Sequence, residues 1–126
     1  MNMVLAIAVG GAAGAVGRHF VNVAMGSLLG SGFPWGTLTV NIAGSLLMGM
    51  LIHVMAVSWT VSPEMRALLT VGFLGAFTTF STFSLDVATL YERDQVGFAA
   101  MYVIVSVVAS VGALFAGLRL ARVVFG

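Results

Sequence analysis

Long stretches without charge constrain this chain more than any other feature of its sequence. Residues 1–17, 19–63, 67–85 and 95–118 contain no Asp, Glu, Lys or Arg. A helix needs about 20 mostly apolar residues to cross the hydrocarbon core of a bilayer. Four crossings therefore fit, and together they use most of the chain. We expect the spans at residues 3–25, 36–58, 64–91 and 96–120.

The connections between these spans are too short to hold a second domain. They are a loop at residues 26–34, a turn at 58–62 and the charged turn Glu92-Arg93-Asp94. Turn residues and charges are typical of segments at a membrane surface. The sequence therefore predicts a single all-α transmembrane domain of four helices. We expect a multi-pass protein of the cell inner membrane, with the lipid bilayer as its main surroundings.

Composition excludes several classes of function. Hydrophobic residues make up 60% of the 126 residues and charged residues only 7%, whereas about a quarter of the residues of a soluble domain are charged. A net charge of +1 leaves no basic surface for nucleic acid. The chain has no cysteine, which excludes disulfides and thiolate metal sites. Since no soluble catalytic domain fits, we expect no enzyme activity, and any function must lie between helices.

Small residues on the first span favour close helix packing. Gly10, Gly14 and Gly17, with Ala13, form pairs of small residues at helical spacing, and such pairs let two backbones approach closely. This face either packs within the chain or meets another subunit. A bundle of four short helices rich in Gly and Ala has little interior for a water-filled pathway. A homo-oligomer is therefore favoured.

The arginines do not choose one orientation in the membrane. With four spans both termini share a side, and Arg66, Arg119 and Arg122 lie there, against Arg93 and Arg18 on the other side. So small a difference allows two interpretations. Copies insert both ways and assemble as an antiparallel, dual-topology homodimer, or the chain has one weakly specified topology.

The third span carries the most information. Ser62-Pro63-Glu64 is typical of a helix start. A helix from residue 63 to 91 would reach roughly 43 Å, against a hydrocarbon core of about 30 Å. Residues 72–84 interrupt its apolar run with two glycines and five hydroxyl residues. Two interpretations remain open: the helix is broken here and presents carbonyls to a cation, or it is continuous and its hydroxyls bond back to carbonyls one turn earlier.

Two further polar stripes follow helical spacing. Their members are Thr37, Asn41 and Ser45 on the second span, and Tyr102, Ser106 and Ser110 on the fourth. Each stripe could form hydrogen bonds between helices or line a polar path. All these side chains are neutral donors and none is a carboxylate. A path lined in this way suits an anion better than a cation or a proton.

The aromatic and charged residues of the spans are ambiguous. Phe73, Phe77, Phe80 and Phe83 recur every three or four residues along one side of the third span. Such a stripe is usually packing, but ring edges are electropositive and can face a dehydrated anion. Arg18 is the one strong cation within the first span, and it is either functional or extends to the first loop. We expect Asp86 to lie near a span end, where solvation or anchoring at the interface is favoured over a role in transport.

Three segments together resemble a known family. They are Gly14-Ala15-Val16-Gly17-Arg18, the segment WGTLTVNIAG at 35–44 and the segment GFLGAFTTFSTFS at 72–84. In this order and spacing they resemble the CrcB, or Fluc, family of bacterial fluoride channels. The resemblance implies a dual-topology antiparallel homodimer with two pores and passive export of fluoride. It also implies a structural sodium ion on the two-fold axis, held by backbone carbonyls where the third helix breaks.

The resemblance also implies roles for individual residues. Gly75 and Thr78 would supply the carbonyls for sodium, and Arg18 would lie at the anion entrance. Asp86 stands where glutamate is common in the family, and it lies outside the expected pore. The expected lining of the fluoride pore is Asn41, Phe80, Phe83, Thr37, Thr79, Ser81, Tyr102, Ser106 and Ser110.

Two other functions are compatible with four short apolar spans. A small multidrug-type exporter coupled to protons would need a carboxylate in the membrane, expected in the first span, and residues 1–17 contain none. A membrane assembly subunit would use the polar stripes only to bind a partner helix. A fluoride channel fits the donors best, because a small, strongly hydrated anion needs its lost water replaced by weak donors at each step.

Overall fold

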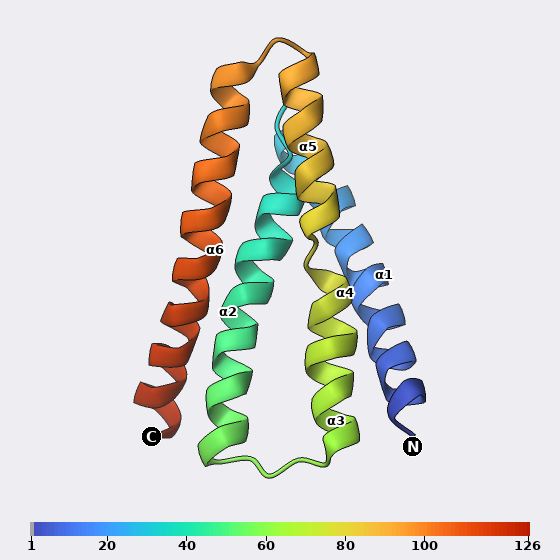
Figure 1. The fold of residues 1–126 in the computed structure, drawn as a ribbon, viewed down its shortest axis with the longest axis vertical. Coiled ribbons are helices and arrows are strands. Elements are labelled where there is room, and N and C mark those ends of the chain that lie inside the picture. Colours follow the sequence, from blue (N-terminus) through green and yellow to red (C-terminus); the bar gives the residue numbers. More distant parts are fainter. Residues whose placement is uncertain (1) are drawn as a thin grey trace.

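The computed structural model describes residues 2–126, and this part of the chain is helical between its turns. The helices are α1 (Met3–Leu29), α2 (Trp35–Val57), α3 (Pro63–Ala67), the π-helical segment η1 (Leu68–Leu74), α4 (Gly75–Phe77), α5 (Phe80–Glu92) and α6 (Val96–Phe125). Four segments are long and apolar enough to cross a membrane: α1, α2, the run Pro63–Glu92 and α6. Both ends of the described chain lie at the same end of the molecule (Figure 1).

Local sequence signals set several of the helix ends. Ser62 accepts a hydrogen bond from the backbone N–H of Met65 at 3.1 Å, and Pro63 occupies the first turn, as predicted. The predicted turn at 92–94 is also present, with Asp94 at a positive φ of 59°. The first loop was predicted to begin at residue 26, but α1 continues to Leu29, and Gly30 is its C-cap. A glycine inside a helix costs only about 1 kcal/mol, so the apolar residues that follow Gly26 can extend α1.

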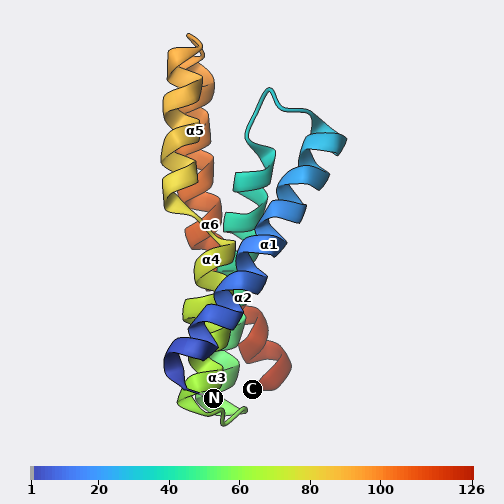
Figure 2. The ribbon, with the colours of Figure 1, turned by 90° about the vertical axis from the view of Figure 1, so that its right-hand side faces the viewer.

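The helices pack mainly in two pairs, and contacts between α1 and α2 connect the pairs. α2 and α6 run side by side over most of their length, and α1 packs against η1 and α4 (Figure 1). α5 leans on α6, and no contact joins α1 to α5 or α6 within residues 2–126. Figure 2 shows that the far end of α1 diverges from α5, so a single copy is splayed at that end.

The glycines of α1 serve packing within one chain. A Cβ built on Gly10 would lie 2.2 Å from the carbonyl oxygen of Leu68, and one on Gly14 would lie 2.1 Å from that of Phe73. Both contacts are backbone atoms of the third span, which cannot retreat without moving a helix. The hypothesis that this face meets another subunit is therefore wrong for Gly10 and Gly14. Their surface is already occupied by η1.

A second close crossing joins α2 to α6. A Cβ on Gly49 would lie 2.1 Å from the carbonyl oxygen of Leu114, and one on Gly117 would lie 2.2 Å from that of Leu46. Each glycine therefore faces the backbone of the opposite helix. Without a Cβ at either position, the two backbones approach closely enough for dispersion contacts along both helices.

The third span changes its backbone conformation near its middle. α4 ends at Phe77, and Thr78 (φ −85°, ψ 159°) and Thr79 (φ −155°, ψ 124°) have extended angles before α5 begins at Phe80. The N–H of Thr78 still donates to the carbonyl of Leu74 at 3.0 Å, but the extended angles at Thr78 and Thr79 end the i to i+4 ladder of the helix there. The backbone groups around Thr78 and Thr79 therefore need other partners, which matters in a membrane where no water can supply them.

Candidate functional site

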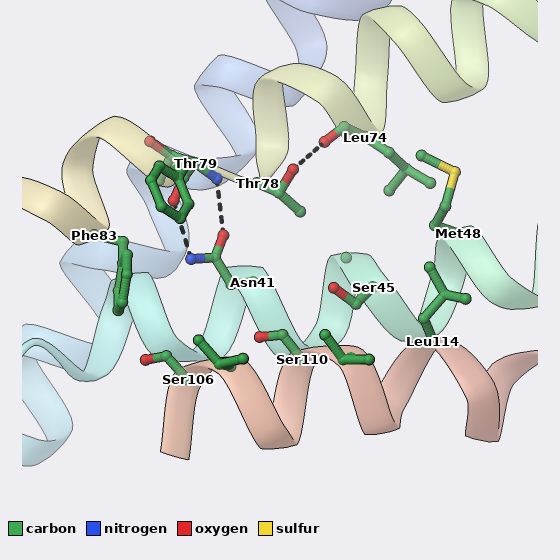
Figure 3. A pocket seen from close by; sticks show the side chains of 14 residues that line it. Asn41, Ser45, Met48, Leu74, Thr78, Thr79, Phe83, Ser106, Ser110 and Leu114 are labelled. Atoms are coloured by element: carbon green, nitrogen blue, oxygen red, sulfur yellow. Dashed lines mark hydrogen bonds between the residues drawn. The ribbon is translucent and has the colours of Figure 1, made fainter. Parts of the chain in front are cut away.

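An open groove of about 480 Å³ lies beside these extended residues, between α2, α5 and α6 (Figure 3). Among residues 2–126, no charged side chain lines it. The lining consists of Asn41, Gly44, Ser45, Met48, Leu74, Thr78, Thr79, Phe80, Phe83, Ser106, Val107, Ser110, Val111 and Leu114. The predicted pore residues Asn41, Thr79, Phe80, Phe83, Ser106 and Ser110 are therefore brought together here.

Asn41 connects the groove wall to the extended backbone of the third span. Its Nδ2 donates to the carbonyl oxygen of Thr79 at 3.0 Å, and its Oδ1 accepts from the N–H of Thr79 at 2.8 Å. Figure 3 shows both bonds crossing from α2 to the segment between α4 and α5. The hydroxyl of Thr79 is used as well, because it accepts from the N–H of Thr82 at 3.1 Å and caps α5. The backbone of Thr79 is therefore bound to the Asn41 side chain in the groove wall, while its hydroxyl is used to cap α5.

Two serines on α6 offer free hydroxyls to this groove. Ser106 is 5% exposed, and the hydroxyl oxygens of Ser106 and Ser110 are buried without a hydrogen-bond partner in residues 2–126. A helical hydroxyl usually bonds back to the carbonyl four residues earlier. The chain uses that bond at Thr39, Thr70, Thr78, Ser84 and Thr89. An unpaired buried hydroxyl costs about 1–3 kcal/mol, so Ser106 and Ser110 stand out as donors available to a ligand.

The phenylalanines divide into two pairs. Phe80 and Phe83 line the groove with ring centroids 5.4 Å apart and planes at 51°. Phe83 is buried, whereas Phe80 is 77% exposed in a single copy. Phe73 and Phe77 stack on each other, and the ring of Phe77 lies near Gly17 of α1 and Gly44 of α2. The prediction of one continuous aromatic stripe is wrong, because the extended residues 78–79 change the helical register between the two pairs.

Tyr102 does not line the groove, although its stripe predicted this. It is fully buried between Phe33 and Phe83, with centroid distances of 5.4 Å and 5.2 Å. Its hydroxyl donates to Oδ2 of Asp86 at 3.0 Å. Asp86 therefore does more than the expected solvation or anchoring near a span end: it lies within α5 and accepts a bond from the buried Tyr102. Phe83 and Asp86 are three positions apart in the sequence, and this spacing puts both side chains on the same face of α5, toward α6. That spacing could have indicated the contact with Tyr102.

Loss of this bond should be measurable as a loss of stability. We expect Tyr102→Phe to lower the free energy of unfolding by about 1–3 kcal/mol, because Oδ2 of Asp86 is left without its donor. Asp86→Asn should cost less, since the amide oxygen can still accept from the tyrosine. Thermal unfolding in detergent measures both variants. Equal stability of Tyr102→Phe and the unchanged protein would contradict a structural role for the bond.

A second hollow, of about 340 Å³, lies between the first loop, α1 and α5. Thr37 lines this hollow rather than the groove, together with Asn22, Thr82, Asp86 and Arg93. Sequence analysis did not single out Asn22. Asn22 packs against the start of α2, because a Cβ on Gly36 would lie 2.1 Å from its side-chain oxygen.

Two predicted residues lie away from both hollows. Ser81 is exposed, and its hydroxyl contacts that of Thr79 at 3.3 Å. Arg18 is half-buried within α1 and lines neither hollow. It stands next to Gly17, where a Cβ would lie 3.6 Å from the ring of Phe77. The backbone of α1 beside Arg18 is therefore close to Phe77, the last residue of α4.

The carbonyls of Gly75 and Thr78, which are expected to hold sodium, lack the N–H donors that a continuous helix would give them. In a continuous helix the N–H of Thr79 would donate to the carbonyl of Gly75, but here it donates to the side chain of Asn41. The N–H of Thr82 would donate to the carbonyl of Thr78, but here it donates to the hydroxyl of Thr79. Gly75 is exposed and Thr78 half-exposed. Neutral oxygens released from the helix suit a hard cation. Residues 2–126 hold no cluster of three carboxylate, His or Cys side chains that could do so.

Comparisons with known proteins agree with these features. Residues 5–118 match the family described as CrcB-like protein, Camphor Resistance (CrcB). The chain is 55% identical over 122 residues to the fluoride-specific ion channel FluC of Rhodospirillum centenum, which covers 97% of both chains. It is 51% identical over 120 residues to the fluoride-specific ion channel FluC 1 of Nitrobacter hamburgensis, with 95% of both chains covered. It is 50% identical over 119 residues to FluC of Agrobacterium fabrum, covering 94% of this chain and 95% of the relative. Four apolar helices and relatives of this kind make it a multi-pass membrane protein, and the chain belongs to the CrcB-like family.

Proposed function

We propose that this chain is a fluoride-selective, passive ion channel that exports fluoride across the inner membrane. The observation that carries this proposal is the pair of buried, unpartnered hydroxyls of Ser106 and Ser110 in a groove without charged side chains. Relatives at 50% to 55% identity are named fluoride-specific ion channels, which supports the same function and argues against an enzyme. Export would follow the fluoride gradient and the membrane potential.

The groove offers what a small halide needs at each step. Fluoride loses a strong hydration shell in a narrow pore, so donors must replace that water without holding the ion firmly. Hydroxyls of Ser106 and Ser110 donate neutral hydrogen bonds, and the ring edges of Phe80 and Phe83 add weak positive potential. Thr37, which lines the second hollow, and Ser81, which follows Phe80 in α5, are proposed as further contacts of the path outside the groove. Arg18 would raise the local anion concentration by its charge.

The pathway would be completed by a second copy in the opposite orientation. Phe80 and Gly75 are exposed in a single copy, and the groove is open on one side. Phe80, Gly75 and the open side of the groove would all be covered in an antiparallel homodimer. The nearly equal number of arginines on the two sides of the membrane allows this arrangement. Two copies related by a two-fold axis have two equivalent grooves, and therefore two pores. The break in the third span at 78–79 would meet its counterpart near this axis.

The carbonyls of Gly75 and Thr78 are proposed to hold a structural sodium ion at that axis. A bound cation supplies a fixed positive field that does not titrate. Each copy would contribute the same two oxygens, freed because Asn41 and Thr79 occupy the N–H groups that would otherwise reach them. The residues of the chain thus prepare the site through their own hydrogen bonds.

Fluoride efflux from proteoliposomes tests the function. We expect the purified protein to release trapped fluoride and to release chloride at least about a hundredfold more slowly, since a larger halide fits a narrow donor-lined path less well. Liposomes without protein are the control. No fluoride efflux would favour the assembly subunit, equal chloride efflux would refute selectivity, and uptake of organic cations driven by protons would indicate a multidrug-type exporter.

Labelling of a single cysteine tests the antiparallel arrangement. The chain has no cysteine of its own, so one introduced at Gly126 is unique. We expect an impermeant thiol reagent added to intact inverted membrane vesicles to label about half of the protein, because copies insert both ways. Permeabilised vesicles measure complete labelling. Labelling of all copies or of none in intact vesicles would refute dual topology.

A further inference from the structure

We infer that Asn41 is a positioning residue, which clamps the backbone of Thr79 and so maintains the extended segment of the third span. This inference deepens the proposed function and rests on it. The resemblance gives Asn41 the role of a donor to the ion. The hydrogen bonds of the structure assign its side-chain amide first to the protein's own backbone.

The clamp satisfies both backbone groups of one residue. The side-chain amide of Asn41 donates to the carbonyl of Thr79 and accepts from its N–H, at 3.0 Å and 2.8 Å. This is the pairing that a neighbouring β-strand would provide for an extended residue. The two residues are 38 positions apart in sequence, so α2 holds the third span at this point.

Other helix starts show how unusual this arrangement is. The carbonyls of the N-cap residues Asn2, Pro34, Ser62 and Gln95 each accept the N–H four residues further on. At the start of α5, the hydrogen bond that the structure gives the Thr79 carbonyl comes from Asn41 instead. Thr79 is partly buried at membrane depth, where no water can replace a missing partner. The extended conformation therefore depends on the amide of Asn41.

Maintaining this conformation positions the rest of the site. With the N–H of Thr79 held by Asn41, the carbonyl of Gly75 loses the donor that a continuous helix would supply. The hydroxyl of Thr79 is then free to cap α5 through Thr82. The start of α5 in turn places Phe80 beside Phe83 in the groove. One side chain on α2 thus controls the released carbonyls and the ring pair together.

The amide bonds also limit what Asn41 can give an ion. Nδ2 has two protons, and one of them is committed to Thr79. A residue that acted only as a donor to the ion could be replaced by serine with partial function. A clamp needs one donor and one acceptor at a fixed reach. Aspartate keeps an acceptor for the N–H of Thr79 but places a second oxygen against its carbonyl.

Hydrogen exchange of the full-length protein tests the clamp without any transport measurement. We expect Asn41→Ala to reduce the protection of the Thr79 amide by about tenfold or more, since the loss of one hydrogen bond is worth roughly that factor. Thr39→Ala is the matched control on the same helix, because the hydroxyl of Thr39 bonds only to Trp35 and faces away from the groove. It should leave exchange at Thr79 unchanged.

A backbone substitution separates the clamp from contact with the ion. Replacing Thr79 by its α-hydroxy acid analogue turns the peptide bond between Thr78 and Thr79 into an ester, which removes the N–H that Asn41 binds and leaves every side chain in place. The ester also weakens the Thr78 carbonyl as an acceptor, so its effect is compared in the presence and absence of Asn41. We expect fluoride efflux to fall at least about tenfold in this ester variant. The combination with Asn41→Ala should conduct no worse than Asn41→Ala alone, because both changes break the same contact.

Each result decides the inference. Faster exchange at Thr79 in Asn41→Ala, with reduced efflux in the ester variant, supports the clamp. Unchanged exchange, or an ester variant that conducts like the unchanged protein, overturns it and leaves Asn41 as a contact to the ion. If Asn41→Ala does not fold, Asn41→Ser, whose side chain is too short to reach both backbone groups of Thr79, takes its place in the exchange measurement. If the unchanged protein carries no fluoride, the proposed function fails, and exchange at Thr79 still tests the clamp.

Discussion

Replacing Phe80 by isoleucine is expected to reduce fluoride efflux by about a hundredfold while the protein stays folded. Phe80 is 77% exposed in a single copy and contacts Phe83 in the groove, so its packing within the chain contributes little to stability. Isoleucine fills similar space but has no electropositive ring edge. A loss of about 3 kcal/mol of ion stabilisation corresponds to roughly a hundredfold in rate. Efflux from proteoliposomes measures it.

Phe115→Ile is the matched control for this prediction. Phe115 is also on the surface of its helix, at 66% exposure, and it does not line the groove. The same change of side chain should therefore leave efflux unchanged. Size-exclusion chromatography shows whether both variants retain the assembly of the unchanged protein. Wild-type efflux in Phe80→Ile would remove the ring edge from the mechanism.

Gly49→Ala is expected to destabilise the fold by more than the 1–3 kcal/mol that is usual for overpacking. The added methyl group would lie 2.1 Å from the carbonyl oxygen of Leu114, so α2 and α6 would have to separate. Backbone atoms cannot turn aside as the end of a flexible side chain can. The contact runs along both helices, and separation at one point weakens its neighbours as well. Thermal unfolding and the yield of folded protein measure the effect.

Gly112→Ala provides the control on α6. A Cβ at Gly112 has nothing within 4 Å, and alanine is favoured over glycine in a helix by about 1 kcal/mol. This variant should therefore be as stable as the unchanged protein or slightly more so. Similar stability for both alanine variants would mean that α2 and α6 do not cross as closely as described.

The helical plan of the chain could be predicted from its sequence because it depends on local signals. Charge-free stretches of about the right length identify the membrane segments. Ser62 and Pro63 mark a helix start, and the charged turn at 92–94 marks a reversal, by chemistry within a few residues. Asn41, Ser106 and Ser110 could be selected as candidates because polar groups in apolar helices need a reason to be there.

The features that could not be predicted depend on contacts between distant segments. The sequence places Asp86 and Tyr102 16 positions apart, and only the packing of α5 on α6 brings them within 3.0 Å. The phenylalanine stripe was divided because Thr78 and Thr79 leave the helical register. Periodicity assumes a continuous helix, so it fails on the far side of any interruption. The surface of Gly10 and Gly14 was likewise ambiguous, since close approach has the same pattern inside a chain and between chains.

The divergence of α1 from α5 in a single copy has a consequence for biogenesis. If a second copy fills that opening, a lone chain is an incomplete product, and its survival depends on how soon it meets another. Mass action then sets how much functional protein a cell contains, and the amount of paired protein rises more steeply than the rate at which the chain is synthesised. Expression level would act as a control in its own right, since sparse chains would remain exposed to membrane proteases.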